Sequence, residues 1–178
     1  MLETLITSKT RIKLLVKFFL KSDSSAYLRG LENELGESSN AVRLELNRFE
    51  KAGLLKTHIE GNKKLFKANP EHPLFKQIHE IVVKHLGIDQ IIDHVANKLG
   101  SLDSCYLTGE FAEGKDSSII DVLFVGDHID KKYLLELVDK AEKYISRKIR
   151  YMVFTLNEFK AYQQKNNKDD DMLLLWKA

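Results

Sequence analysis

Residues 39–69 read SNAVRLELNRFEKAGLLKTHIEGNKKLFKAN, and this stretch decides the fold of the first third of the chain. In its first half, Val42, Leu46 and Phe49 recur at the i, i+4, i+7 spacing of one buried face of a helix. A glycine at position 53 is typical of a helix end. In its second half, two alternating runs flank a Gly-Asn pair, which favours the tight turn of a β-hairpin. The stretch therefore predicts a helix over residues 39–52 followed by a hairpin.

Two further helical patterns precede this stretch. Residues 10–20 (TRIKLLVKFFL) repeat apolar side chains at helical spacing. Residues 28–35 form a shorter pattern that Gly36 ends, and the polar residues before it are expected to cap it. Ser38 or Ser39 can then cap the helix that follows. A short helix, a tight turn and a second helix make a helix-turn-helix, whose second helix normally enters the major groove of DNA.

The rest of the chain is organised differently. Two prolines in ANPEHPLF (residues 68–75) mark a boundary, and apolar residues then recur over residues 74–86 as in a helix. This helix is either a connector packed on both neighbours or a dimer-forming helix. Another helix is expected over residues 88–99, ended by Gly100.

Strand-like and helical segments alternate after Gly100, as in a small α/β domain. The expected elements are strands in SCYLTG and IIDVLFVG around the loop EFAEGKDSS, a helix over residues 131–146, a strand in KIRYMVFTL and a short helix from Asn157. The domain organisation that follows is residues 1–70, a connecting helix in residues 71–87, and residues 88–178.

Composition bounds the class of protein. With 178 residues, 43% of them hydrophobic, and only 2 prolines, we expect a folded, helix-rich chain. Cys105 is the one cysteine, so neither an intramolecular disulfide nor a thiolate metal cluster can form within the chain. The start of the chain lacks the apolar core of a signal peptide, and no apolar run reaches membrane-spanning length. These features favour a cytoplasmic protein without a membrane partner.

Charge is distributed unevenly along the chain. Residues 1–70 hold 13 Lys and Arg against 8 Asp and Glu, whereas residues 71–178 hold 15 against 18. A basic first third points towards nucleic acid, although an ordinary solvated surface gives the same count.

The outward side of the helix over residues 39–52 carries side chains suited to DNA. Arginine can donate two hydrogen bonds to guanine, and asparagine can pair with adenine. Leu44 is unusual there: it either touches a thymine methyl group or packs sideways, and packing is favoured. The expected DNA-binding residues of this helix are Ser39, Asn40, Arg43, Leu44, Asn47 and Arg48.

Two lysines lie beside the hairpin turn, at positions 63 and 64. Cations on a projecting loop suit contacts to phosphates, which position a protein without reading sequence. The alternative is a lysine-rich edge that discourages pairing with other strands. Because a helix-turn-helix stands directly before them, we expect Lys63 and Lys64 to contact DNA.

The segments SKTRIKLLVKFFL and YLRGLENELGESSNAVRLELNRFEKAGLLKTHIEGNKKLFKANPEHPLF resemble the ArsR-type winged-helix domain of transcriptional regulators. In that resemblance Gly53 ends the recognition helix and Gly61 lies at the wing tip. The resemblance implies a homodimer that places two recognition helices in successive major grooves of double-stranded DNA. Metal-sensing members carry cysteine or histidine ligands on their helices, and no such cluster is present here, so we expect no metal site.

Residues 107–127, LTGEFAEGKDSSIIDVLFVGD, resemble the DNA polymerase β-like nucleotidyltransferases, in particular their small minimal domains. The motif of that superfamily is Gly-Ser at a strand end, a loop glycine, then Asp-x-Asp on the next strand, where the carboxylates hold two magnesium ions. Here Ile119 takes the place of the first aspartate and Arg150, Tyr151 and Met152 stand where a third carboxylate is expected. The residues that match or replace the motif form a vestigial nucleotide pocket of Gly109, Glu110 in place of serine, Gly114 and Asp121.

A two-metal mechanism cannot run on one carboxylate, so no catalytic residue is assigned and no cofactor is expected. Asp121 is then a structural acid bonded to nearby backbone, and Cys105 a buried small residue. We predict an α+β protein of two domains, an N-terminal winged helix-turn-helix and a C-terminal nucleotidyltransferase-like α/β domain. The predicted function is DNA-binding regulation of transcription by a dimer, whose second domain supplies ligand, partner or dimer contacts. The alternatives are a metal-dependent nucleotidyltransferase tethered to nucleic acid and a protein–protein adaptor that has lost DNA binding.

Overall fold

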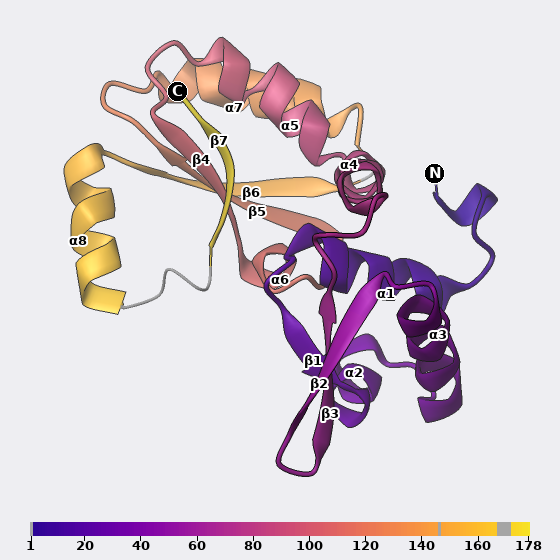
Figure 1. Cartoon of the computed structure of the whole chain (residues 1–178). Coiled ribbons are helices and arrows are strands. Elements are labelled where there is room, and N and C mark those ends of the chain that lie inside the picture. Colours follow the sequence, from indigo (N-terminus) through magenta and orange to yellow (C-terminus); the bar gives the residue numbers. More distant parts are fainter. Residues whose placement is uncertain (1, 146, 167–171) are drawn as a thin grey trace. The chain divides into compact units, whose positions relative to one another are not determined.

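The structure is a computed structural model that describes residues 2–145, 147–166 and 172–178 (Figure 1). It is a mixed α+β protein that divides into two compact units. The first unit contains the residues up to His85 together with Gly114–Asp116, and the second contains Leu86–Glu113 and Ser117–Ala178. No helix in the described residues combines the length and the apolar character needed to cross a bilayer.

The first unit is a winged helix. Its elements are η1 (Leu2–Thr4), α1 (Lys9–Leu20), β1 (Ser25–Tyr27), α2 (Leu28–Leu35), α3 (Ser39–Lys51), β2 (Leu55–Glu60), β3 (Lys63–Ala68) and α4 (Phe75–Leu86), whose last residue falls in the second unit. The strands form an antiparallel sheet in the order β1-β3-β2, and the β2–β3 hairpin is the wing. The predicted helices and hairpin are confirmed, with Gly36 in the left-handed conformation after α2 and Ser38 capping α3.

Strand β1 was not predicted, because its residues were expected only to cap the next helix. Three residues carry too weak a pattern to identify a strand, and here the pairing of Ala26 with Phe66 of β3 holds them extended. The core of this unit lies under the sheet and between the helices. Its largest fully buried side chains are Leu14, Phe18, Phe19, Leu31 and Leu46, and the predicted inner face of α3 is confirmed by the burial of Val42, Leu46 and Phe49.

The second unit is a four-stranded mixed sheet with helices. Its elements are α5 (Ile88–His94), η2 (Ala96–Lys98), β4 (Ser104–Thr108), α6 (Gly109–Ala112), β5 (Ile119–Val125), α7 (Lys131–Glu142), β6 (Lys148–Phe154), α8 (Leu156–Asn166) and β7 (Leu173–Lys177). The strand order is β6-β5-β4-β7, with β5 and β6 parallel and the other pairs antiparallel. The core is formed by apolar residues of β4 and β5 with Leu134, Leu137 and Val138 of α7.

Three expectations for this unit were wrong in detail. The single helix over residues 88–99 is instead α5 followed by the short 3-10 helix η2, because the chain bends at Val95. The first residues of the loop EFAEGKDSS belong to the short helix α6. Helix α7 ends at Glu142, four residues before the expected end at Ser146, which lies outside the described residues.

Candidate nucleic-acid interface

The outward side of α3 is exposed to solvent. Asn40, Arg43 and Asn47 lie on it, and within the described part of the chain their side chains form no hydrogen bond or ion pair. Helical periodicity explains the arrangement, since the buried positions Val42, Leu46 and Phe49 occupy the opposite side. These three polar side chains are therefore available to a ligand that approaches α3.

The other predicted residues of α3 are exposed but differ in their contacts. Ser39 donates its hydroxyl to a carboxylate oxygen of Glu32, at the end of α2. Leu44 is 51% exposed, and whether it packs sideways or touches a thymine methyl group stays a prediction. Arg48 donates from Nη1 to Oε1 of Glu45 at 2.8 Å. All six predicted residues of α3 are thus exposed, and Arg48 also forms an ion pair, with Glu45.

The wing places both predicted lysines next to aromatic rings. Gly61 has φ 58°, the left-handed conformation that lets the hairpin turn tightly. The Nζ atom of Lys63 lies 4.5 Å from the ring centroid of Tyr27, and that of Lys64 lies 5.2 Å from the ring of Phe66. Lys64 also pairs with both carboxylate oxygens of Glu50 at 2.8 Å, which lowers the pKa of Glu50. Glu50 therefore ties the wing to the end of α3.

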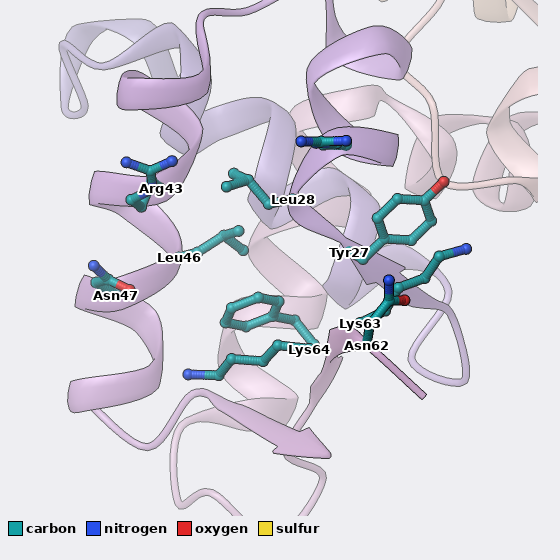
Figure 2. A pocket seen from close by; sticks show the side chains of 10 residues that line it. Tyr27, Leu28, Arg43, Leu46, Asn47, Asn62, Lys63 and Lys64 are labelled. Carbon is teal, nitrogen blue, oxygen red and sulfur yellow. The ribbon is translucent and has the colours of Figure 1, made fainter. Parts of the chain in front are cut away.

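A groove of about 510 Å³ separates α3 from the wing (Figure 2). Figure 2 shows Arg43 and Asn47 along one side, Tyr27, Asn62 and Lys63 on the other, and Leu28 and Leu46 between them. Ten residues line the groove: Tyr27, Leu28, Arg29, Arg43, Leu46, Asn47, Asn62, Lys63, Lys64 and Phe66. Four of these are cations and none is an acid, so the groove favours an anionic ligand.

Six of the ten lining residues were not among the predicted DNA-binding residues, and three of these six carry polar groups: Tyr27, Arg29 and Asn62. Tyr27 and Arg29 flank the first residue of α2, and Asn62 occupies the turn. The pairing of β1 with β3 places Tyr27 beside the wing, and the sequence interpretation did not include β1. Arg29 could nevertheless have been identified from the sequence as a candidate, because it is a basic residue at the start of the first helix of the helix-turn-helix.

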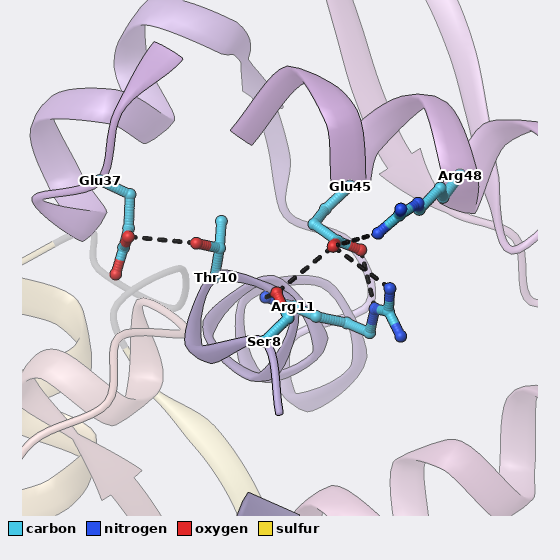
Figure 3. Close-up of polar contacts among 6 residues, drawn as sticks. All are labelled: Ser8, Thr10, Arg11, Glu37, Glu45 and Arg48. Atoms are coloured by element: carbon cyan, nitrogen blue, oxygen red, sulfur yellow. Dashed lines mark hydrogen bonds and ion pairs between the residues drawn. The ribbon is translucent and has the colours of Figure 1, made fainter. Parts of the chain in front are cut away.

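Acidic residues join the inner side of the helix-turn-helix to α1 (Figure 3). Glu45 of α3 is 3% exposed and accepts hydrogen bonds from Nε of Arg11 at 2.7 Å and from Nη2 of Arg11 at 3.2 Å. Glu37, in the turn before α3, accepts from Lys13 at 2.7 Å and from the Thr10 hydroxyl at 3.1 Å. Two of the basic residues of the first third, Arg11 and Lys13, thus pair with acids of the same unit.

These bonds set the ionisation of both acids. Burial alone would raise the pKa of Glu45, but hydrogen bonds from Arg11 and the charges of Arg11 and Arg48 more than offset it, so the pKa is lowered. The Lys13 hydrogen bond is the main cause of a lowered pKa at Glu37. Both acids are therefore held as carboxylates.

The predicted vestigial pocket is only partly assembled. A concavity of about 400 Å³ in the second unit is lined by Thr108, Gly109, Asp121, Val122, Arg150, Tyr151, Met152 and Tyr162. Glu110 and Gly114 do not line it: Glu110 is an exposed residue of α6, and Gly114 groups with the first unit. Two of the four predicted residues are thus brought together.

An ion pair occupies the position where the resemblance implied metal ligands. Asp121 of β5 lies opposite Arg150 of β6 in the sheet register. Both of its carboxylate oxygens accept from the guanidinium group, Oδ2 from Nη2 at 2.9 Å and Oδ1 from Nε. The expectation that Asp121 bonds nearby backbone is therefore wrong, because the arginine at the paired position of the neighbouring strand supplies the donors. Cys105 is fully buried, as predicted, and burial raises the pKa of its thiol to about 12.

Comparison with known proteins gives local similarity only. No family model matches the chain, and no curated protein matches it. Reduced HlyU from Vibrio cholerae is 18% identical, with a TM-score of 0.37, over 47% of this chain and 83% of that one. The transcriptional regulator BldR from Sulfolobus solfataricus is 16% identical, with a TM-score of 0.37, over 55% and 70%.

A proposed nucleotidyltransferase from Sulfolobus solfataricus is 24% identical, with a TM-score of 0.35, over 53% of this chain and 82% of that one. Each of these structures corresponds to about half of the chain. Scores below 0.5 establish no ligand or activity for this protein.

Proposed function

We propose that this chain is a DNA-binding regulator of transcription. The observation that carries the proposal is the exposed face of α3, whose polar side chains Asn40, Arg43 and Asn47 lack partners in the described chain. Arg43 and Asn47 also line a cationic groove. Guanidinium and amide groups on an exposed helix match the donor and acceptor pattern of base edges in the major groove.

The groove supplies the second half of the proposed interface. A strand of DNA carries one phosphate charge per nucleotide, and the cations lining the groove come from α2, α3 and the wing. With α3 in the major groove, Lys63 and Arg29 are proposed to hold the flanking phosphates. Lys64 joins them by exchanging the carboxylate of Glu50 for a phosphate, because both are anions that pair with an ammonium group.

The protein is proposed to act as a homodimer. Leu74, Ile78 and Ile81 recur at i, i+4, i+7, and Leu74 and Ile81 are 54% and 44% exposed. This apolar row, which starts at Leu74 directly before α4 and continues on α4, is suited to burial against the same row of a second copy. Two copies would present two recognition helices to one duplex, which favours a palindromic site.

The second unit is proposed to be catalytically inactive and to provide ligand, partner or dimer contacts. Ile119 offers no ligand for a metal ion, and Arg150 already satisfies both oxygens of Asp121. A two-metal reaction needs several free carboxylates at one point, so this arrangement favours binding over chemistry. The competing function, a metal-dependent nucleotidyltransferase, depends on the nucleotidyltransferase-like arrangement of β4 and β5 alone.

Selection of bound duplexes from a random pool tests the proposal. We expect enrichment of a palindrome, and Arg43→Ala should abolish discrimination at one base pair of each half-site at a cost of about 1–3 kcal/mol. Lys140→Ala, at an exposed lysine of α7, is the matched control and should leave binding unchanged. An unenriched pool, or unchanged selectivity in Arg43→Ala, would reject the assignment of α3 as the reading element.

A further inference from the structure

Glu45 is an acid placed where α3 otherwise buries apolar side chains. Its neighbours on that side are Val42, Leu46 and Phe49, and its own side chain is 5% exposed. A carboxylate at such a position is tolerated only when its oxygens are bonded. Oε1 accepts from Arg48 Nη1, Arg11 Nη2 and, at 3.3 Å, the Ser8 hydroxyl, while Oε2 accepts from Arg11 Nε (Figure 3).

Arg48 connects this internal acid to the outer surface. Its side chain is 52% exposed, and one guanidinium nitrogen is 2.8 Å from Glu45. The remaining donors of the planar group are not used by any other contact within the described residues. Arg48 is thus held at its inner edge and open at its outer edge.

We infer that Glu45 is a positioning residue for DNA binding, which holds α3 against α1 through Arg11 and aims the guanidinium group of Arg48 at the phosphate backbone. This inference rests on the proposed function, and it assigns Glu45 no contact with DNA.

Side-chain entropy explains why such a device matters. A free arginine samples many rotamers, and fixing it on binding weakens affinity. If Glu45 already orders Arg48 in the free protein, the entropy cost of fixing this side chain is part of the free energy of folding and no longer weakens DNA binding. Because α3 turns by 100° per residue, the Arg11 bonds also resist rotation of the helix, which would move the outward side chains together.

A double-mutant cycle tests the coupling. Glu45→Gln keeps the shape and removes the charge; Glu37→Gln is the matched control, because Glu37 also bonds α1 but makes no bond to Arg48. We expect Glu45→Gln to weaken binding to a selected duplex about three- to tenfold. Arg48→Ala should weaken the wild type, and should add little in the Glu45→Gln background but its full effect in the Glu37→Gln background. Equal effects of Arg48→Ala in all three backgrounds would overturn the inference.

A measurement without DNA separates this inference from the proposed function. In ¹⁵N spectra of the arginine guanidinium groups, wild type and Glu37→Gln should show two resolved Nη signals for Arg48, and Glu45→Gln should merge them. Persistence of both signals in Glu45→Gln would refute the positioning role, whether or not the protein binds DNA. Absence of DNA binding by the wild type with the expected spectra would reject the function and leave the Glu45–Arg48 coupling standing. Should Glu45→Gln not fold, Glu45→Asp, which keeps the charge but shortens the side chain, replaces it in both measurements.

Discussion

The groove between α3 and the wing leads to a quantitative expectation for Lys63→Ala. Four cations line it: Arg29, Arg43, Lys63 and Lys64. If Arg29, Lys63 and Lys64 each meet one phosphate while Arg43 contacts a base, the logarithm of the association constant falls with the logarithm of salt concentration with a slope of about −3 for one protomer and about −5 for two. Removing Lys63 should make the slope shallower by about 1 for each bound protomer.

Fluorescence anisotropy with a selected duplex, titrated between about 50 and 200 mM salt, measures this slope. A dimer of the wild type should lose about 10³-fold in affinity over that range. The matched control Lys140→Ala removes an exposed lysine of the second unit and should retain the wild-type slope. Equal slopes for Lys63→Ala and this control would show that Lys63 meets no phosphate and that the groove is not the backbone site.

Three further outcomes follow from the described contacts. Glu50→Gln should tighten DNA binding a few-fold at low salt, because Lys64 no longer needs to leave a carboxylate; weaker binding would show that the ion pair mainly braces the wing. Because the pKa values of Glu37 and Glu45 are lowered by folding, their stabilising effect is complete above the ordinary carboxyl pKa and is lost as pH falls through the lower folded values. Urea unfolding between about pH 6 and pH 3 should show that loss, and a Glu45→Gln variant with an undiminished pH dependence would contradict it. Calorimetric titration of Mg-ATP should give no magnesium-dependent heat, whereas binding that disappears in Asp121→Asn would support an enzyme.

Most of the first unit could be predicted because its signals are local. Helical spacing on α3, Gly36 at the end of α2 and Gly61 in the wing each act within a few residues. Strand β1 could not be predicted in this way, since three residues gain their conformation only from pairing with β3. The groove was missed for the same reason, because Tyr27 reaches Lys63 through that pairing.

Charged partners were the hardest part of the candidate sites to predict. Glu45 appears in the sequence as an ordinary helix acid, and nothing near it in the chain identifies Arg11 as its partner. Asp121 and Arg150 are likewise joined only by the register of β5 and β6. The exposed side of α3 was predictable from periodicity, but the ion pairs that Arg11 and Lys13 of α1 form with Glu45 and Glu37 were not.

Gly109 is kept free of a side chain by its immediate surroundings. Its φ is 62°, and a Cβ atom there would lie 2.6 Å from Oδ2 of Asp121, an oxygen that Arg150 fixes in place. Any larger residue would have to strain the backbone and displace the ion pair, so steric exclusion alone is enough to keep the position without a side chain. A saturation library at this codon should accept little besides glycine whether or not the protein has turnover, so a glycine at this position is weak evidence for enzymatic activity in related chains.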